Sequence, residues 1–147
     1  MRYLLDTNIL LLYLREDEIA IEIEANYQIL DNNNLAFISV VSKGELKALA
    51  LRNKWGNKRM RKLDTFLDLF LIVDINAEDI IDKYAEIDAF SQGKLASYPS
   101  PLSARNMGKN DIWIAATTSV LEAQLITTDK DFEHLDEVFL NLLLIER

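Results

Sequence analysis

Short apolar segments that end at acidic residues recur along this chain, and they limit its fold more than any other feature. Tyr3-Leu4-Leu5 is typical of a buried strand and leads directly into Asp6. Leu125-Ile126-Thr127 likewise enters a turn that contains Asp129, and Asp111 opens an apolar helical run. In open α/β sheets, ligands bind beyond the carboxyl ends of the strands, so we expect these distant acids to meet there.

Strand and helix patterns alternate along the whole chain, which favours an α/β fold with a mostly parallel central sheet. The predicted strands are Arg2–Leu5, Leu35–Val41, Leu71–Ile75, Leu125–Thr127 and Val138–Ile145, the last at a sheet edge. The predicted helices are Ile9–Leu14, Asp17–Leu30, Ser42–Lys54, Asn57–Leu71, Asn76–Gly93 and Asn110–Ala123, with one further turn at Lys130–Leu135. The segment Lys94–Lys109, which contains both prolines, is predicted to be a long loop that ends at the site.

Composition favours one domain in a reducing compartment. With 147 residues, half of them hydrophobic, the chain is long enough for one proper core, and we expect a single domain over residues 1–147. It has no apolar run typical of a membrane span and no signal-peptide pattern. It also lacks cysteine, which excludes disulfides and thiolate metal sites, so we expect a cytoplasmic protein.

The charge is acidic overall but unevenly distributed. A formal charge of −8 argues against a nucleic-acid partner, because phosphate binding depends on Lys and Arg. Half of the 16 basic residues, however, lie between Lys43 and Lys62, where Glu45 is the only acid. This window is either a solvated helical surface or a basic face that binds phosphates.

Several residues also have purely structural explanations. Asp6 can cap the helix that follows it, and Ser42 with Glu45 three residues later matches a capping box. Trp55 is expected to pack against the fold rather than stack on a base. His134, the only histidine, is expected to be a surface residue in a polar turn.

The acids predict a metal site if they converge. Four carboxylates within a few ångströms repel one another, so some must be protonated or a cation must lie among them. Oxygen ligands without His or Cys select Mg²⁺ or Mn²⁺, and one or two such ions can activate water and stabilise the reacting oxygens of a phosphodiester. The predicted catalytic and metal-binding residues are Asp6, Glu45, Asp111 and Asp129.

Competing chemistries lack the necessary residues. A single histidine leaves little material for a Ser-His-Asp triad, and the four glycines form no phosphate-binding loop. An aspartate-nucleophile phosphatase would want a second acid two residues after Asp6, where Asn8 stands instead.

Four motifs, in this order and spacing, resemble the PIN-domain ribonucleases, and most closely the VapC-type toxins of toxin–antitoxin pairs. They are Asp6-Thr7-Asn8, Ser42-Lys43-Gly44-Glu45-Leu46, Asn110-Asp111-Ile112-Trp113-Ile114-Ala115-Ala116 and Thr127-Thr128-Asp129-Lys130-Asp131-Phe132. The resemblance covers essentially the whole chain. It implies a three-layer α/β/α sandwich, one or two Mg²⁺ or Mn²⁺ ions, endonucleolytic cleavage of RNA, a homodimer and a small antitoxin partner.

The resemblance also assigns roles to single residues. Asp6, Glu45, Asp111 and Asp129 match its four acids, while Asn8, Thr127 and Asp131 match positions that orient ligands or water. Whether Asp129 or Asp131 is the closer metal ligand is left open. The expected RNA-binding side chains are Lys43, Lys47, Arg52, Lys54, Arg105 and Lys109.

Two alternatives to a toxin nuclease stay open at this point. One is a PIN fold that has lost catalysis and acts as an interaction module, although none of the four acids is replaced. The other is a standalone RNA-processing nuclease without an antitoxin. The loop Lys94–Lys109 is longer than in compact toxins, which leaves RNA specificity and the dimer edge undetermined.

Overall fold

The buried strand predicted at the N-terminus lies at the centre of a five-stranded parallel sheet. A computed structural model describes residues 1–98 and 104–147 and gives the strand order β3-β2-β1-β4-β5. The strands are β1 (Arg2–Leu5), β2 (Leu35–Ser39), β3 (Leu71–Val73), β4 (Gln124–Thr127) and β5 (Asn141–Leu144). The order places β1 between β2 and β4, so the carboxyl ends of these three strands meet along one edge.

The side chains of β1 alternate between two separate apolar layers. Tyr3 and Leu5 pack into one hydrophobic cluster, whereas Leu4 packs into the other. This alternation is expected of a strand that is covered on both faces. The fold therefore has three layers, as the α/β/α prediction required.

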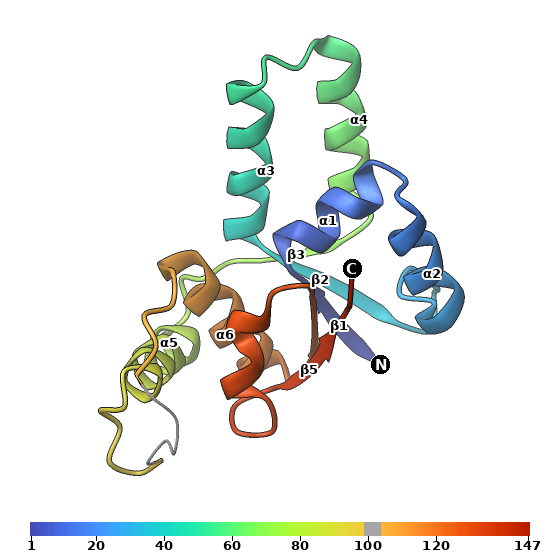
Figure 1. Ribbon diagram of the computed structural model, residues 1–147. Helices are drawn as coiled ribbons and strands as arrows, with labels where there is room; N and C mark the ends of the chain where they lie inside the picture. Colours follow the sequence, from blue (N-terminus) through green and yellow to red (C-terminus); the bar gives the residue numbers. More distant parts are fainter. Residues whose placement is uncertain (99–103) are drawn as a thin grey trace.

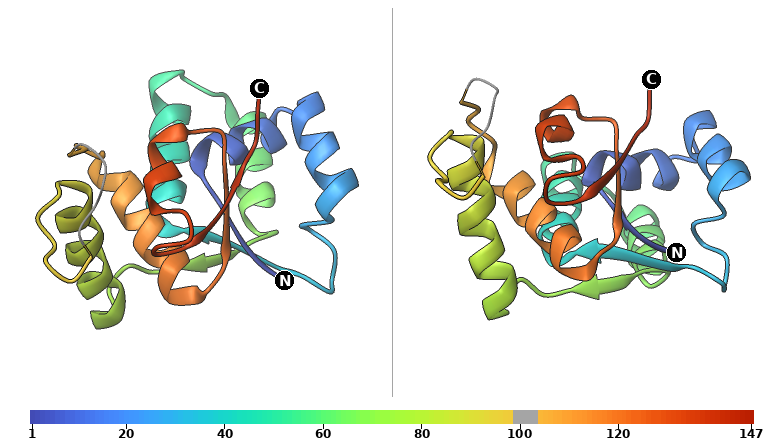
Figure 2. Two further views of the ribbon diagram at one scale, coloured as in Figure 1. Left: turned by 60° about the horizontal axis from the view of Figure 1, so that its bottom comes forward. Right: turned by 90° about the horizontal axis from the view of Figure 1, so that it is seen from below.

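Helices cover both faces of the sheet (Figures 1 and 2). The cluster around Leu5 includes residues of α1 (Thr7–Leu14), α2 (Glu18–Tyr27), α3 (Val40–Arg52) and α4 (Asn57–Leu67). The cluster around Leu4 includes residues of α5 (Glu78–Ser91), α6 (Lys109–Leu121) and the short 3-10 helix η1 (Lys130–Leu135). Each predicted helix is present, and α1 begins where its predicted cap Asp6 accepts a hydrogen bond.

Some element boundaries differ from the prediction. The second strand ends at Ser39 instead of Val41, and α4 ends at Leu67 instead of Leu71. The last strand is confined to Asn141–Leu144, an edge strand as predicted. The apolar runs continue past these ends, and the exposed Val40 and Leu69 show that hydrophobicity alone does not mark where an element stops.

The predicted long loop is partly described. Residues 94–98 and 104–108 form no helix or strand, and the loop ends at α6. Pro99 and Pro101 lie outside the described residues. Among the residues described, no helix is both long and apolar enough to cross a bilayer.

Candidate active site

The four predicted acids approach the carboxyl edge of the sheet from separate elements. Asp6 directly follows β1, Asp129 follows β4 and Glu45 lies in the second turn of α3, which follows β2. Asp111 lies in the first turn of α6. Because α6 leads into the parallel strand β4, its N-terminus lies at this same edge. The topology thus directs all four acids to one region.

Asp6 is the most buried of the four acids and is held at both carboxylate oxygens. Only 4% of its surface is exposed. The Thr7 backbone N–H donates to Oδ1 over 2.8 Å, and the Thr127 hydroxyl donates to Oδ2 over 2.6 Å. The second distance is typical of a hydroxyl that donates to an ionised carboxylate. Asp6 is therefore fixed in position, which goes beyond the capping role that its sequence context indicated.

Thr127 connects Asp6 with Asp129. Its hydroxyl oxygen accepts a hydrogen bond from the Asp129 backbone N–H over 3.0 Å while it donates to Asp6. Asp129 in turn caps η1, because its Oδ1 accepts from the Asp131 backbone N–H over 2.9 Å. Thr127 is fully buried, Asp129 is half-buried and Asp131 is exposed. The turn between β4 and η1 is therefore connected to Asp6 by hydrogen bonds.

Glu45 is connected to the site through Thr7. The Thr7 hydroxyl lies 2.8 Å from Glu45 Oε1 and also 2.8 Å from the Ser42 hydroxyl. The predicted capping box is wrong, because α3 begins at Val40 with Ser39 as its cap, and Ser42 lies inside the helix. Glu45 is consequently free of any role in capping, and its carboxylate is held from α1 instead.

Thr7 and Ser42 were not among the predicted site residues. Their sequence context offered a simpler interpretation, in which Ser42 and Asp6, the neighbour of Thr7, only cap helices. The signal that could have identified them is their regular placement: each is a hydroxyl residue near the start of a helix that follows one of two strands predicted to end at the site.

The carboxylates influence one another electrostatically. Burial, and then the charges of Asp129 and Glu45, raise the pKa of Asp6, although the hydrogen bonds from Thr127 and Thr7 oppose this change. Burial, followed by the charges of Asp6, Asp129, Glu45 and, last, Asp131, raises the pKa of Asp111 from 3.8 to about 7. Such mutual effects require the acids to be near neighbours. The predicted convergence of the acids agrees with these couplings.

The donor chemistry of this site fits a hard divalent cation. All of its side-chain donors are oxygens, and carboxylates that raise one another's pKa are stabilised by a positive charge between them. Within residues 1–98 and 104–147, however, no three Asp, Glu or His side chains already lie close enough together to hold a metal ion. The site therefore has suitable oxygen donors in one region, and the carboxylates would have to move closer together to bind a cation.

A groove of about 460 Å³ extends from Glu45 along α3. Gly44, Ala48 and Arg52 line it together with Asn110 at the start of α6. The other predicted RNA-binding side chains are exposed or half-buried on α3, in the turn after it, and near the start of α6; they are Lys43, Lys47, Lys54, Arg105 and Lys109. Basic side chains therefore lie along α3 and around the start of α6, the two helices that carry Glu45 and Asp111.

The structure also gives the positions of three other residues whose roles were predicted. Asn8 is exposed in the first turn of α1. The prediction for His134 is wrong: it is 9% exposed, its Nε2 lies 2.8 Å from the Ser91 hydroxyl, and its ring stacks near Phe90. The cause is that η1 folds back onto the end of α5, which burial patterns in a short polar turn do not reveal. Trp55, as predicted, packs against the core and lies under the Arg59 guanidinium at 4.6 Å.

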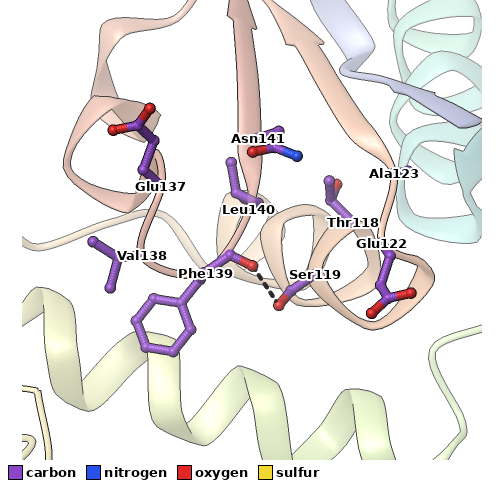
Figure 3. A pocket seen from close by; sticks show the side chains of 9 residues that line it. All are labelled: Thr118, Ser119, Glu122, Ala123, Glu137, Val138, Phe139, Leu140 and Asn141. Atoms are coloured by element: carbon purple, nitrogen blue, oxygen red, sulfur yellow. Dashed lines mark hydrogen bonds between the residues drawn. The ribbon is translucent and has the colours of Figure 1, made fainter. Parts of the chain in front are cut away.

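A separate pocket of about 350 Å³ lies away from these acids (Figure 3). It is formed by the end of α6 and the segment that enters β5, so it lies at the opposite edge of the sheet. Glu122 and Glu137 lie on its two sides, and the Ser119 hydroxyl donates to the Phe139 carbonyl across it over 2.7 Å. Its lining offers no acid that interacts with Asp6, so we place the chemistry at the carboxyl edge.

Comparison with known proteins assigns this fold to a family. The PIN domain family model matches residues 3–138. The chain belongs to the PIN domain family. This confirms the resemblance predicted from the four motifs. A comparison of this PIN domain with curated proteins finds no match.

Solved structures agree with the family assignment. The PIN domain is 26% identical to VapBC-1 from nontypeable Haemophilus influenzae, with a TM-score of 0.73 over 98% of each chain. VapBC2 from Rickettsia felis, bound to a DNA fragment from its promoter, gives 23% identity and a TM-score of 0.77 over 97% of this chain and 98% of that one. A toxin–antitoxin complex from Klebsiella pneumoniae gives 20% and 0.70 over 99% of both. The predicted likeness to VapC-type toxins is confirmed, and with it a place in their nuclease family.

Proposed function

We propose that this PIN domain is a Mg²⁺- or Mn²⁺-dependent endoribonuclease that hydrolyses RNA phosphodiester bonds as the toxin of a toxin–antitoxin pair. One observation carries the proposal: hydrogen bonds link the buried Asp6 to Asp129 through Thr127, and link Glu45 to the same helix start through Thr7. The raised pKa of Asp111 adds the fourth acid to this group. Carboxylates in such mutual repulsion are suited to share a cation.

Each acid has a role in holding one or two cations. Asp6, Glu45, Asp111 and Asp129 are the proposed ligands and together form the catalytic group. A divalent ion bound there would offset their repulsion and act as a Lewis acid at the phosphodiester. Thr127 fixes the Asp6 carboxylate, while Asn8 and Asp131, both exposed, orient ligands from the rim.

Electrostatics favour Asp129 over Asp131 as the closer ligand. The charge of Asp129 raises the pKa of both Asp6 and Asp111. Among the four acids, Asp131 affects only the pKa of Asp111, as the weakest of the contributing charges. Because Coulomb interactions weaken with distance, we propose Asp129 as the closer metal ligand.

The RNA strand is proposed to follow the groove beside α3. This groove joins Glu45 to Arg52, so a phosphate held by Arg52 would keep the neighbouring nucleotides close to the acids. Lys43, Lys47, Lys54, Arg105 and Lys109 would supply further phosphate contacts. Such contacts make binding weaken as salt rises.

The proposed toxin role is based on the solved structures that this chain resembles. The Klebsiella pneumoniae structure is a toxin–antitoxin complex, which supports a small antitoxin partner for this chain. We expect that partner and a second copy of this chain to cover exposed apolar side chains such as Leu51, which is 74% exposed, and Leu69, which is 59% exposed. A cytoplasmic location agrees with an RNA substrate and with the absence of cysteine.

RNA cleavage tests the proposal. The purified protein is incubated with total RNA and Mg²⁺ or Mn²⁺, beside Asp6→Asn, Asp111→Asn and an exposed control, Asp79→Asn in the first turn of α5. We expect cleavage by the wild type and by the control, with a loss of at least about 100-fold in the two site variants. Equal cleavage by all four proteins would show that the acids are not the catalyst. No cleavage by the wild type would favour the interaction module.

A further inference from the structure

Two hydroxyl groups join the starts of α1 and α3 next to Glu45. Thr7 is the first residue of α1 and Ser42 the third residue of α3. Thr7 Oγ1 lies 2.8 Å from Ser42 Oγ and 2.8 Å from Glu45 Oε1. Ser42 is fully buried, so water competes little for its hydroxyl, and Thr7 is half-buried.

Counting protons gives this chain of hydrogen bonds a direction. Thr7 donates its single hydroxyl proton to Glu45 Oε1, so it has none left for a second hydrogen bond. The contact between the two hydroxyls then requires Ser42 to donate to Thr7 Oγ1. A hydroxyl that accepts a hydrogen bond becomes a stronger donor, so Ser42 strengthens the bond that Thr7 makes to Glu45.

Ser42 is used differently from the two buried threonines of α6. Thr117 and Thr118 in α6 donate to the backbone carbonyls of Trp113 and Ile114, one turn earlier. This local bond is the usual way to satisfy a buried hydroxyl in a helix. Ser42 instead contacts a side chain of another helix. Its position is therefore explained by Thr7 and Glu45 rather than by the needs of α3 alone.

We propose that Ser42 and Thr7 form a hydroxyl relay that holds the Glu45 carboxylate towards the other acids and thereby tunes the affinity of the site for a divalent cation. The proposal rests on the metal-dependent function proposed above. Neither hydroxyl contacts the reacting atoms, so both are positioning residues. The relay occupies Oε1 of Glu45 and leaves Oε2 for a cation. Side chains that orient metal ligands in this way commonly influence affinity as much as some ligands do.

Mn²⁺ binding, measured by calorimetric titration, tests the relay with four variants. Thr7→Val removes the hydroxyl at nearly constant shape and should weaken binding about tenfold. Thr7→Ser keeps the hydroxyl and should stay within about twofold of the wild type. Ser42→Ala should weaken binding about threefold, because it removes only the supporting donor. Thr117→Val, which removes a hydroxyl that bonds locally, is the control and should bind as the wild type does.

The outcomes separate the relay from the proposed function. Equal Mn²⁺ binding by Thr7→Val and the wild type would overturn the relay, as would Thr7→Ser binding as weakly as Thr7→Val. Normal metal affinities with the predicted pattern but no RNA cleavage would overturn the proposed function and keep the relay. If the wild type binds no Mn²⁺, the metal-dependent function fails. In that case, the melting temperatures of Thr7→Val, Ser42→Ala and the double variant test the relay. If the decrease in the double variant equals the sum of the two single decreases, the relay is wrong.

Discussion

Replacing Asp111 by Asn should stabilise the protein without metal while it abolishes activity. The pKa of Asp111 is raised from 3.8 to about 7, first by burial and then by its acidic neighbours. An acid whose pKa is higher in the folded state than in the unfolded state favours folding least when it is ionised. Stability should therefore fall as the pH rises from about 4 to about 7, and the amide of Asn should remove this loss.

The expected size of the effect follows from the shift in the pKa. About three pKa units correspond to roughly 4 kcal/mol, but Asp111 is half-exposed and solvent screens its charge, so we take about 2 kcal/mol. Asn also loses the favourable interaction of a negative charge with the first turn of α6, which costs about 0.5–1 kcal/mol. The net gain is about 1 kcal/mol, or roughly 3 °C in melting temperature for a chain of this length.

Thermal unfolding with a chelator present, at about pH 8 and about pH 4, measures this effect. Asp111→Asn should melt about 3 °C above the wild type at the higher pH and equal to it or slightly below it at the lower pH. Asp79→Asn is the matched control, because Asp79 also lies in a first helical turn but is exposed on α5. It should show no gain at either pH. A destabilised Asp111→Asn protein at about pH 8 would refute the electrostatic reasoning.

Three other substitutions test separate parts of the structure. Thr127→Val leaves the buried Asp6 carboxylate with one hydrogen bond fewer and should cost about 1–3 kcal/mol in urea unfolding; a loss under about 0.5 kcal/mol would contradict the role of the 2.6 Å contact. His134→Ala should cost about 2 kcal/mol by the same measurement, whereas a surface histidine would cost almost nothing. Gly44→Ala should raise the free energy of unfolding by about 0.5–1 kcal/mol, because Gly44 lies inside α3 and a Cβ there meets no atom within 4 Å. A melting temperature below that of the wild type would contradict this expectation.

The parts of the fold that were predicted correctly are those where local and long-range signals agree. Tyr3-Leu4-Leu5 is apolar on both faces, and it is buried on both faces because it lies at the centre of the sheet. Asp6 is both a good helix cap and an acid at a strand end, and it does both things in the structure. A short apolar segment followed by an acid was therefore enough to place Asp6 at the carboxyl end of the central strand.

The start of α3 could not be predicted because two serines, three residues apart, can each cap a helix. Only the pairing of β2 with β3, in which Ser39 faces Val73, shows that the strand ends at the first serine. Ser42 therefore does not cap α3, and its hydroxyl contacts that of Thr7 instead. No local sequence pattern predicts this contact between distant segments. His134 illustrates the same limit, because its burial depends on how η1 meets the end of α5.

The proton balance of metal binding tests the central claim most directly. Calorimetric titration with Mn²⁺ in buffers of different ionisation enthalpy measures how many protons leave the protein when the ion binds. If the four acids share the cation, binding should release protons at about pH 6, where Asp111 is protonated, and few at about pH 9. Asp111→Asn should bind Mn²⁺ more weakly and release fewer protons at the lower pH. Mn²⁺ binding without proton release at about pH 6, or no binding at all, would contradict the shared site.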